Sequence, residues 1–96
     1  MSAATGVSID AVRAQIEAID ERLIAAIAER VSLARAAGCA KRANGQPVVD
    51  PAREAAVVSR ASTLARAHGL PEDDVRALYW RLMAMSRHVQ LEDASR

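Results

Sequence analysis

The chain has 96 residues, so we expect one small domain, or part of a shared one, with little room for a second unit. Apolar residues make up 51% of the chain and aromatic residues only 2%, so the core must come from aliphatic side chains and methionine, a mix that favours helices. The formal net charge is +1, with acidic and basic residues interleaved. This pattern lacks the one-sided basic surface of a nucleic-acid-binding protein.

The predicted location is the cytoplasm. Cys39 is the only cysteine, which excludes an internal disulfide or a thiolate metal cage and fits a reducing compartment. Residues 1–6 do not contain a basic segment followed by an apolar run, and no apolar stretch approaches the length that spans a bilayer. We therefore expect a soluble protein with no membrane association.

The first predicted helix covers residues 8–43. Ser8 is of the type that caps a helix N-terminus, and apolar residues then recur at three- and four-residue steps. They are Ile9, Val12, Ile16, Ile19, Leu23, Ile27 and Val31. Gly38 weakens this helix only modestly, and the first proline is Pro47.

Two shorter helices are predicted at residues 50–68 and 71–91. Residues 44–47 form a turn, after which Asp50 is an N-cap and Pro51 the first helical residue. Gly69 ends the second helix and Pro71 opens the third. The third helix should end near Leu91, with residues 92–96 frayed. The fold class is therefore all-α, with three helices in one domain over residues 1–96.

The length of the first helix predicts an oligomer. About 35 residues at 1.5 Å each span about 50 Å, whereas a compact domain of this size has a radius of gyration near 12 Å. The apolar stripe would be exposed on the overhang unless a partner covers it. An intertwined homodimer is the simplest solution.

Several polar residues could line a pocket. Arg30 and Lys41 are 11 residues apart, almost a whole number of turns, and therefore point the same way. Arg13 lies about 25 Å before Arg30, so it would reach such a pocket only from the second chain of an antiparallel dimer. Singly, arginines such as Arg13 and Arg30 on a helix surface are more often solvated, so neither is evidence of a site by itself.

Other candidate residues lie on the second and third helices. The second helix begins with Asp50, Arg53 and Glu54, and Ser86 and Gln90 share one face of the third. Asp50 alone is simply a cap. Lys41 is the only lysine beside twelve arginines, which suggests a contact that needs a compact ammonium rather than a guanidinium.

Taken in order, these residues resemble the small all-helical (type II) class of chorismate mutase, in its stand-alone, monofunctional form. Segments 12–16, 19–23 and 28–34 look like the first helix of that family. Segment 40–41 continues this match, and segments 47–50 and 53–54 match the turn and the second helix of that family. Ser86 and Gln90 fall where its third helix contributes. No single motif is specific, but the ordered set is.

The resemblance implies an isomerase that converts chorismate to prephenate in phenylalanine and tyrosine biosynthesis. This intramolecular Claisen rearrangement needs no nucleophile, metal or cofactor. The protein holds a flexible dianion in its reactive shape and stabilises charge on the ether oxygen.

The resemblance also implies a role for each residue. Arg30 and the partner's Arg13 would bind the two carboxylates with help from Ser86, while Lys41 and Gln90 donate to the ether oxygen. Glu54 and the backbone at Asp50 would hold the ring hydroxyl, and Arg53 lines the pocket.

Three alternatives remain open. Isochorismate pyruvate lyase and aminodeoxychorismate mutase use the same scaffold but tend to depart at the positions of Asp50 and Glu54. A non-catalytic helical dimerisation module would explain the long helix but not the ordered polar set.

Some small relatives gain activity by binding the first enzyme of the shikimate pathway. The sequence does not decide whether this chain has that partner.

Overall fold

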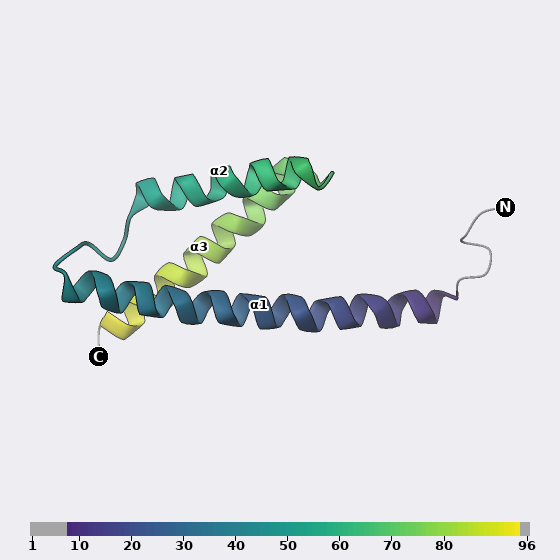
Figure 1. Cartoon of the computed structure of the whole chain (residues 1–96), viewed down its shortest axis with the longest axis horizontal. Helices are drawn as coiled ribbons and strands as arrows, with labels where there is room; N and C mark the ends of the chain where they lie inside the picture. The colour runs from purple at the N-terminus through teal and green to yellow at the C-terminus, as the bar shows by residue number, and fades with distance from the viewer. Residues whose placement is uncertain (1–7, 95–96) are drawn as a thin grey trace. The chain divides into compact units, whose positions relative to one another are not determined.

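The computed structural model describes residues 8–94, and within this range every regular element is a helix (Figure 1). The helices are α1 (Ile9–Ala43), α2 (Pro51–Ala67) and α3 (Glu72–Ala94). This confirms the all-α class. The chain divides into two units, residues 1–30 and 31–96. Within the described residues, no helix is long and apolar enough to cross a membrane. The expectations for residues 1–6 and 95–96 fall outside this range.

α1 begins at the predicted cap and stays helical for 35 residues. The Ser8 hydroxyl accepts a hydrogen bond from the amide of Ala11 at 3.0 Å, which satisfies one of the donors that a helix N-terminus leaves free. The helix passes through Gly38 without interruption. At 1.5 Å per residue, its length is about 50 Å.

The turn between α1 and α2 follows from two local signals. Gly45 adopts φ +69, which glycine tolerates without strain, and the amide of Gln46 closes the helix end on the Lys41 carbonyl at 2.8 Å. The Asp50 carboxylate then caps α2 by accepting from the amide of Arg53 at 3.1 Å, with Pro51 in the first turn. The predicted turn and cap are both confirmed.

The turn between α2 and α3 is also as predicted, whereas the end of α3 is not. Gly69 has φ +69, and the amide of Leu70 bonds to the Ala65 carbonyl at 2.8 Å. The expectation that the third helix ends near Leu91 and frays from residue 92 was wrong, because α3 continues to Ala94. A salt bridge of 2.8 Å between Arg35 of α1 and Asp93 holds this last turn.

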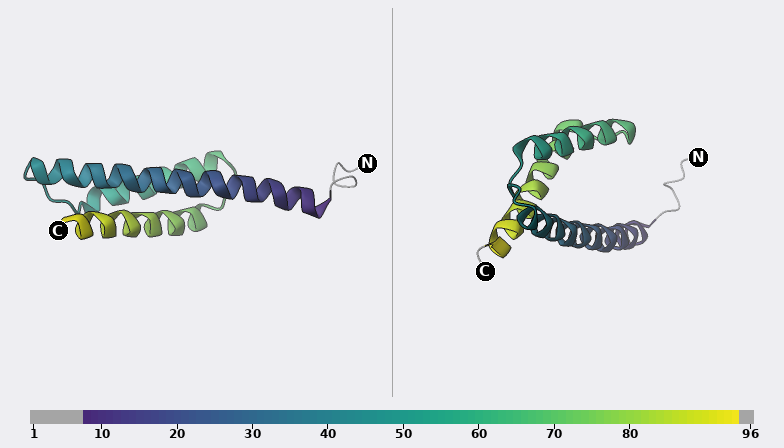
Figure 2. Two further views of the ribbon diagram at one scale, coloured as in Figure 1. Left: turned by 90° about the horizontal axis from the view of Figure 1, so that it is seen from below. Right: turned by 60° about the vertical axis from the view of Figure 1, so that its left-hand side comes forward.

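In residues 31–96, α3 folds back from the Gly69 turn, and its last turns lie beside the C-terminal part of α1 (Figure 2). The buried apolar side chains come from α2 and α3 and are small or flexible. They are Val58, Ala61, Ala65, Met83 and Val89. Short alanine side chains let the two helices approach closely, and aliphatic side chains with methionine fill the core as the composition predicted.

A polar cluster joins α2 to the start of α3. Glu72 accepts hydrogen bonds from Arg66 at 2.9 Å and from Ser62 at 2.9 Å, and Arg76 donates to the Ser62 hydroxyl at 2.7 Å. The hydrogen bonds from Arg66 and then Ser62 lower the pKa of Glu72 to about 2. The charged form of Glu72 therefore contributes to holding the turn.

Residues 8–30 form only the first part of α1, and most of their large apolar side chains are exposed. Among the exposed members of the predicted stripe, the exposed fraction runs from 40% at Val12 to 66% at Ile9, whereas Ile27 is half-buried. The other exposed members are Ile16, Ile19 and Leu23. Soluble proteins rarely leave such a continuous apolar surface uncovered.

Candidate active site

Gln90 is the most enclosed of the predicted site residues. It lies on α3 with 9% of its surface exposed, and its side-chain nitrogen Nε2 donates to the main-chain oxygen of Ala34 on α1 at 2.8 Å. Its own main-chain oxygen accepts from Nη1 of Arg42 at 3.3 Å. Two contacts with α1 thus fix this one residue.

The Ala34 contact also fixes which way the Gln90 amide faces. A carbonyl oxygen only accepts, so the amide nitrogen rather than the amide oxygen must point to Ala34. The nitrogen carries two hydrogens, and one of them remains available to a ligand. Gln90 is therefore held as a neutral hydrogen-bond donor.

Gly38 makes the close approach of Gln90 to α1 possible. A Cβ at this position would lie 3.0 Å from Cγ of Gln90 and 3.5 Å from its Cβ, tighter than ordinary van der Waals contact at the first atom. Glycine inside a helix costs up to about 1 kcal/mol relative to alanine, so its presence here has a packing reason. The sequence showed Gly38 only as a weak point in α1.

Lys41 follows Gly38 by three residues and so lies one turn further along the same side of α1. It is half-buried, and its ammonium donates to the main-chain oxygen of Val48 at 3.3 Å. An ammonium carries three hydrogens, which leaves two for a ligand. Lys41 is thus a donor on α1, one turn beyond the glycine against which Gln90 of α3 packs.

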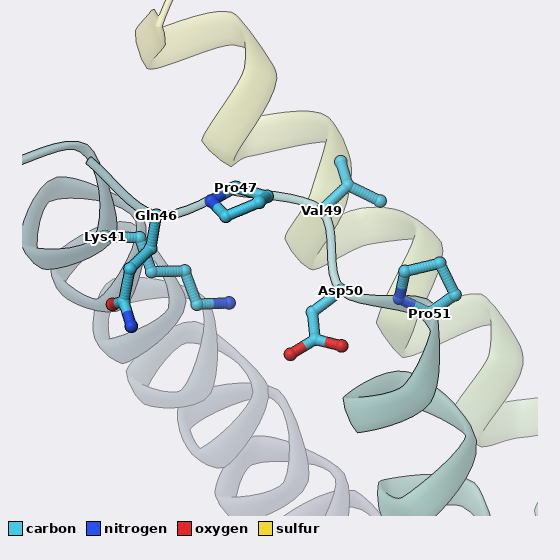
Figure 3. A pocket seen from close by; sticks show the side chains of 6 residues that line it. All are labelled: Lys41, Gln46, Pro47, Val49, Asp50 and Pro51. Atoms are coloured by element: carbon cyan, nitrogen blue, oxygen red, sulfur yellow. The ribbon is translucent and has the colours of Figure 1, made fainter. Parts of the chain in front are cut away.

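A cavity of about 420 Å³ lies beside Lys41 (Figure 3). Its walls come from the end of α1, the following loop and the start of α2; the remaining lining residues are Gln46, Pro47, Val49, Asp50 and Pro51. Figure 3 shows the Lys41 ammonium and the Asp50 carboxylate turned into the space between α1 and the loop. The structure therefore brings two predicted site residues to one cavity.

Asp50 and Arg53 occupy the start of α2. The Asp50 carboxylate is already engaged as the helix cap through the amide of Arg53, and both side chains are exposed. Because the carboxylate serves as the cap, it is the main chain at Asp50 that fits the role expected from the sequence, which is to help hold a ring hydroxyl.

Glu54 forms a contact that the sequence did not indicate. Its Oε1 accepts a hydrogen bond from Nη1 of Arg87 on α3 at 2.6 Å, and the Glu54 and Arg87 side chains are 15% and 37% exposed. The two residues are 33 positions apart, so the pair depends on how α2 and α3 pack. Arg87 directly follows the candidate Ser86, which is half-buried on α3.

Arg13 and Arg30 lie on the residue 8–30 part of α1. Arg13 is exposed and Arg30 is half-buried. Their 17-residue separation along one continuous helix corresponds to about 25 Å, too far for both to hold one small ligand. A shared site with the other candidates stays a prediction for these two residues.

Comparisons with known proteins identify the family to which the chain is similar. The family described as chorismate mutase type II matches the chain over residues 12–91. The bifunctional chorismate mutase/prephenate dehydratases of Escherichia coli strain K12, E. coli O157:H7 and Shigella flexneri are each 41% identical to it over 69 residues. The aligned part is 72% of this chain and 18% of each relative, so the chain spans less than a fifth of their length.

Proposed function

Because the chain belongs to the chorismate mutase type II family, we propose that it is an isomerase that converts chorismate to prephenate. The observation that carries the proposal is the pair of donors on one side of α1: Gln90, fixed by the Ala34 carbonyl, and Lys41, one turn beyond Gly38. The rearrangement breaks a C–O bond and forms a C–C bond within one molecule. It therefore requires placed donors rather than a nucleophile.

The chemistry assigned to the two donors is electrostatic. As the C–O bond stretches, negative charge builds on the ether oxygen, and donors that are already oriented stabilise this charge without reorganisation. Lys41 supplies a charged donor and Gln90 a neutral one. Both retain hydrogens beyond those used in their contacts with Val48 and Ala34.

The remaining residues bind and shape the substrate. Arg30 of one chain and Arg13 of the partner bind the two carboxylates, for which the planar guanidinium is suited, and Ser86 assists. Glu54 and the main chain at Asp50 hold the ring hydroxyl, and Arg53 lines the pocket. Holding both ends of the flexible dianion favours the compact shape from which the reaction proceeds.

A homodimer belongs to this proposal. The exposed apolar side chains of residues 8–30 supply a surface for a second copy. The span of α1 between Arg13 and Arg30 supports a site shared by two chains, because one helix cannot bring both arginines to one small ligand. The single Cys39 and the metabolic role favour a cytoplasmic location. Activation by the first enzyme of the shikimate pathway is a separate partner hypothesis, tested by adding that enzyme to the assay.

The test follows the loss of chorismate absorbance together with the formation of prephenate. We expect turnover by the wild type, a loss of about 100-fold in kcat for Lys41→Ala, and little change for the control Arg60→Ala, whose exposed side chain lies on α2. A wild type without turnover, or equal turnover by the wild type and Lys41→Ala, would contradict the proposal. Absence of turnover in the wild type would favour a dimerisation module, whereas equal turnover in both would remove Lys41 from the mechanism.

Parallel assays separate the sister activities. Isochorismate and aminodeoxychorismate are offered to the same protein, and the products are identified. Preferred turnover of either compound would replace chorismate as the proposed substrate while retaining the scaffold. We expect chorismate to be preferred because the chain keeps acceptors at both Asp50 and Glu54.

A further inference from the structure

Arg87 of α3 is joined to Glu54 of α2 by a hydrogen-bonded ion pair of 2.6 Å between Nη1 and Oε1. We propose that Arg87 is a positioning residue that sets the orientation and offsets the charge of Glu54, so that this carboxylate can accept a hydrogen bond from a neutral ring substituent of an anionic substrate. The inference rests on the proposed function, in which Glu54 holds the ring hydroxyl.

The first argument is one of charge. The Glu54 side chain is only 15% exposed, so water screens its negative charge poorly, and an unpaired carboxylate there would repel a dianionic substrate. Arg87 places a permanent positive charge 2.6 Å from that carboxylate. The pair is close to neutral as a unit, which makes an acid residue compatible with an anion-binding site.

The second argument is one of orientation. The hydrogen bond from Arg87 ends on Oε1 of Glu54, and its short length is typical of a charge-assisted bond. This bond limits rotation of the carboxylate and leaves Oε2 to accept from a donor such as a hydroxyl group. Without Arg87, either oxygen could turn toward the substrate, and the acceptor would no longer be fixed.

The third argument is the difference between this pair and the ion pairs formed within α3. Arg76 and His88 pair with acidic residues on α3 itself, at i,i+3 or i,i+4 spacing. The Arg87 pair instead joins two helices, as two other ion pairs of α3 do, but it is the one among these whose partner is a candidate site residue. Local surface pairs of the first kind contribute little, whereas a partly buried pair between helices can determine geometry.

The experiment is a double-mutant cycle in the full chain. Arg87→Met, Glu54→Gln and the double variant are compared with the wild type for kcat and KM toward chorismate and for urea unfolding. Arg87→Lys keeps the charge without the planar fork, and Arg87→Gln is a second neutral variant if Arg87→Met does not fold. Arg81→Met is the matched control, because Arg81 is an exposed arginine on the same helix.

We expect Arg87→Met to raise KM about tenfold with a smaller change in kcat, and Arg87→Lys to recover most of that loss. In the Glu54→Gln background, the same Arg87→Met change should alter KM less than about twofold, because the carboxylate on which it acts is gone. Arg81→Met should leave KM unchanged.

Two outcomes would overturn the inference while leaving the proposed function intact. One is an equal KM change for Arg87→Met in both backgrounds. The other is a lower free energy of unfolding with kcat and KM unaltered, which would assign Arg87 to structure alone. Absence of turnover in the wild type is a different result, since it overturns the proposed function and the inference with it.

Discussion

The side-chain amide of Gln90 donates to the main-chain oxygen of Ala34 across the contact between α3 and α1, at 2.8 Å. The acceptor has no hydrogen to give, so any residue at position 90 must present a donor to it. The packing of α3 on α1 therefore determines that the side chain at position 90 carries a hydrogen that it can donate.

Gln90→Glu tests that link. An ionised glutamate would set one of its oxygens against the Ala34 carbonyl and could donate neither there nor to the substrate. We expect wild-type kcat/KM to need no acidic pH, and the variant to be active only at low pH and to lose about 100-fold toward neutral pH. Rate profiles from about pH 4.5 to 8 check this, with Gln90→Ala as the control that has no group to titrate. Parallel profiles for wild type and Gln90→Glu would contradict the assigned donor role.

Gly38→Ala tests the close approach of the helices. The new Cβ would lie 3.0 Å from Cγ of Gln90 and displace the amide, so we expect kcat to fall about tenfold. Intrinsic helix propensity would rise by up to about 1 kcal/mol, so lost activity need not mean lost helix. Circular dichroism and kinetics are measured together. Ala37→Ser is the control, since it adds one heavy atom at an exposed position of α1. Unchanged kcat in Gly38→Ala would show that Gln90 accommodates the methyl group.

Stability should fall in acid because of Glu72. Its pKa in the folded chain is about 2, below its ordinary value of 4.5, so folding favours the charged form. The contribution is fully present above pH 4.5 and is lost as the pH falls through about 2. Urea unfolding between neutral pH and about pH 2 measures this loss, and Glu72→Gln should remove this part of the pH dependence. Because the group is at the surface, added salt should weaken the effect. An identical acid response in wild type and Glu72→Gln would exclude Glu72 as its source.

Subunit mixing tests whether Arg13 serves the partner's site. Arg13→Ala and Arg30→Ala homodimers should both be nearly inactive. After exchange, one site of each heterodimer carries both defects and the other carries neither, so an equal mixture should recover about a quarter of wild-type activity. Exchange is verified by mass spectrometry of differently tagged chains. Proven exchange without recovery would place Arg13 and Arg30 in the same chain's site or in none.

Local signals in the sequence were sufficient for the helix ends. Ser8, the Asp50–Pro51 pair and Gly69 act on backbone groups within a few residues of themselves, so their roles could be read without knowing the fold. The end of α3 could not be read in this way. Its last turn depends on Asp93 meeting Arg35, a residue 58 positions away.

In the candidate site, too, local features could be predicted from the sequence, whereas contacts between distant residues could not. Residue types and order pointed to Lys41, Glu54 and Gln90, but the partners of these side chains depend on the packing of one helix on another. Nothing near Glu54 in the sequence indicates Arg87. Gly38 carried a signal that was visible but ambiguous, because a glycine inside a helix can mark a close contact or merely a tolerated weakness.

The acceptor that orients Gln90 is a main-chain atom, so it exists whatever side chain stands at position 34. Point mutation cannot delete it directly. Random mutagenesis with selection for growth should therefore leave position 34 tolerant of other small residues while reporting strongly on Gly38 and Gln90. A mutational map of this site would consequently not reveal the main-chain oxygen at position 34, because a substitution can remove this acceptor only by displacing α1.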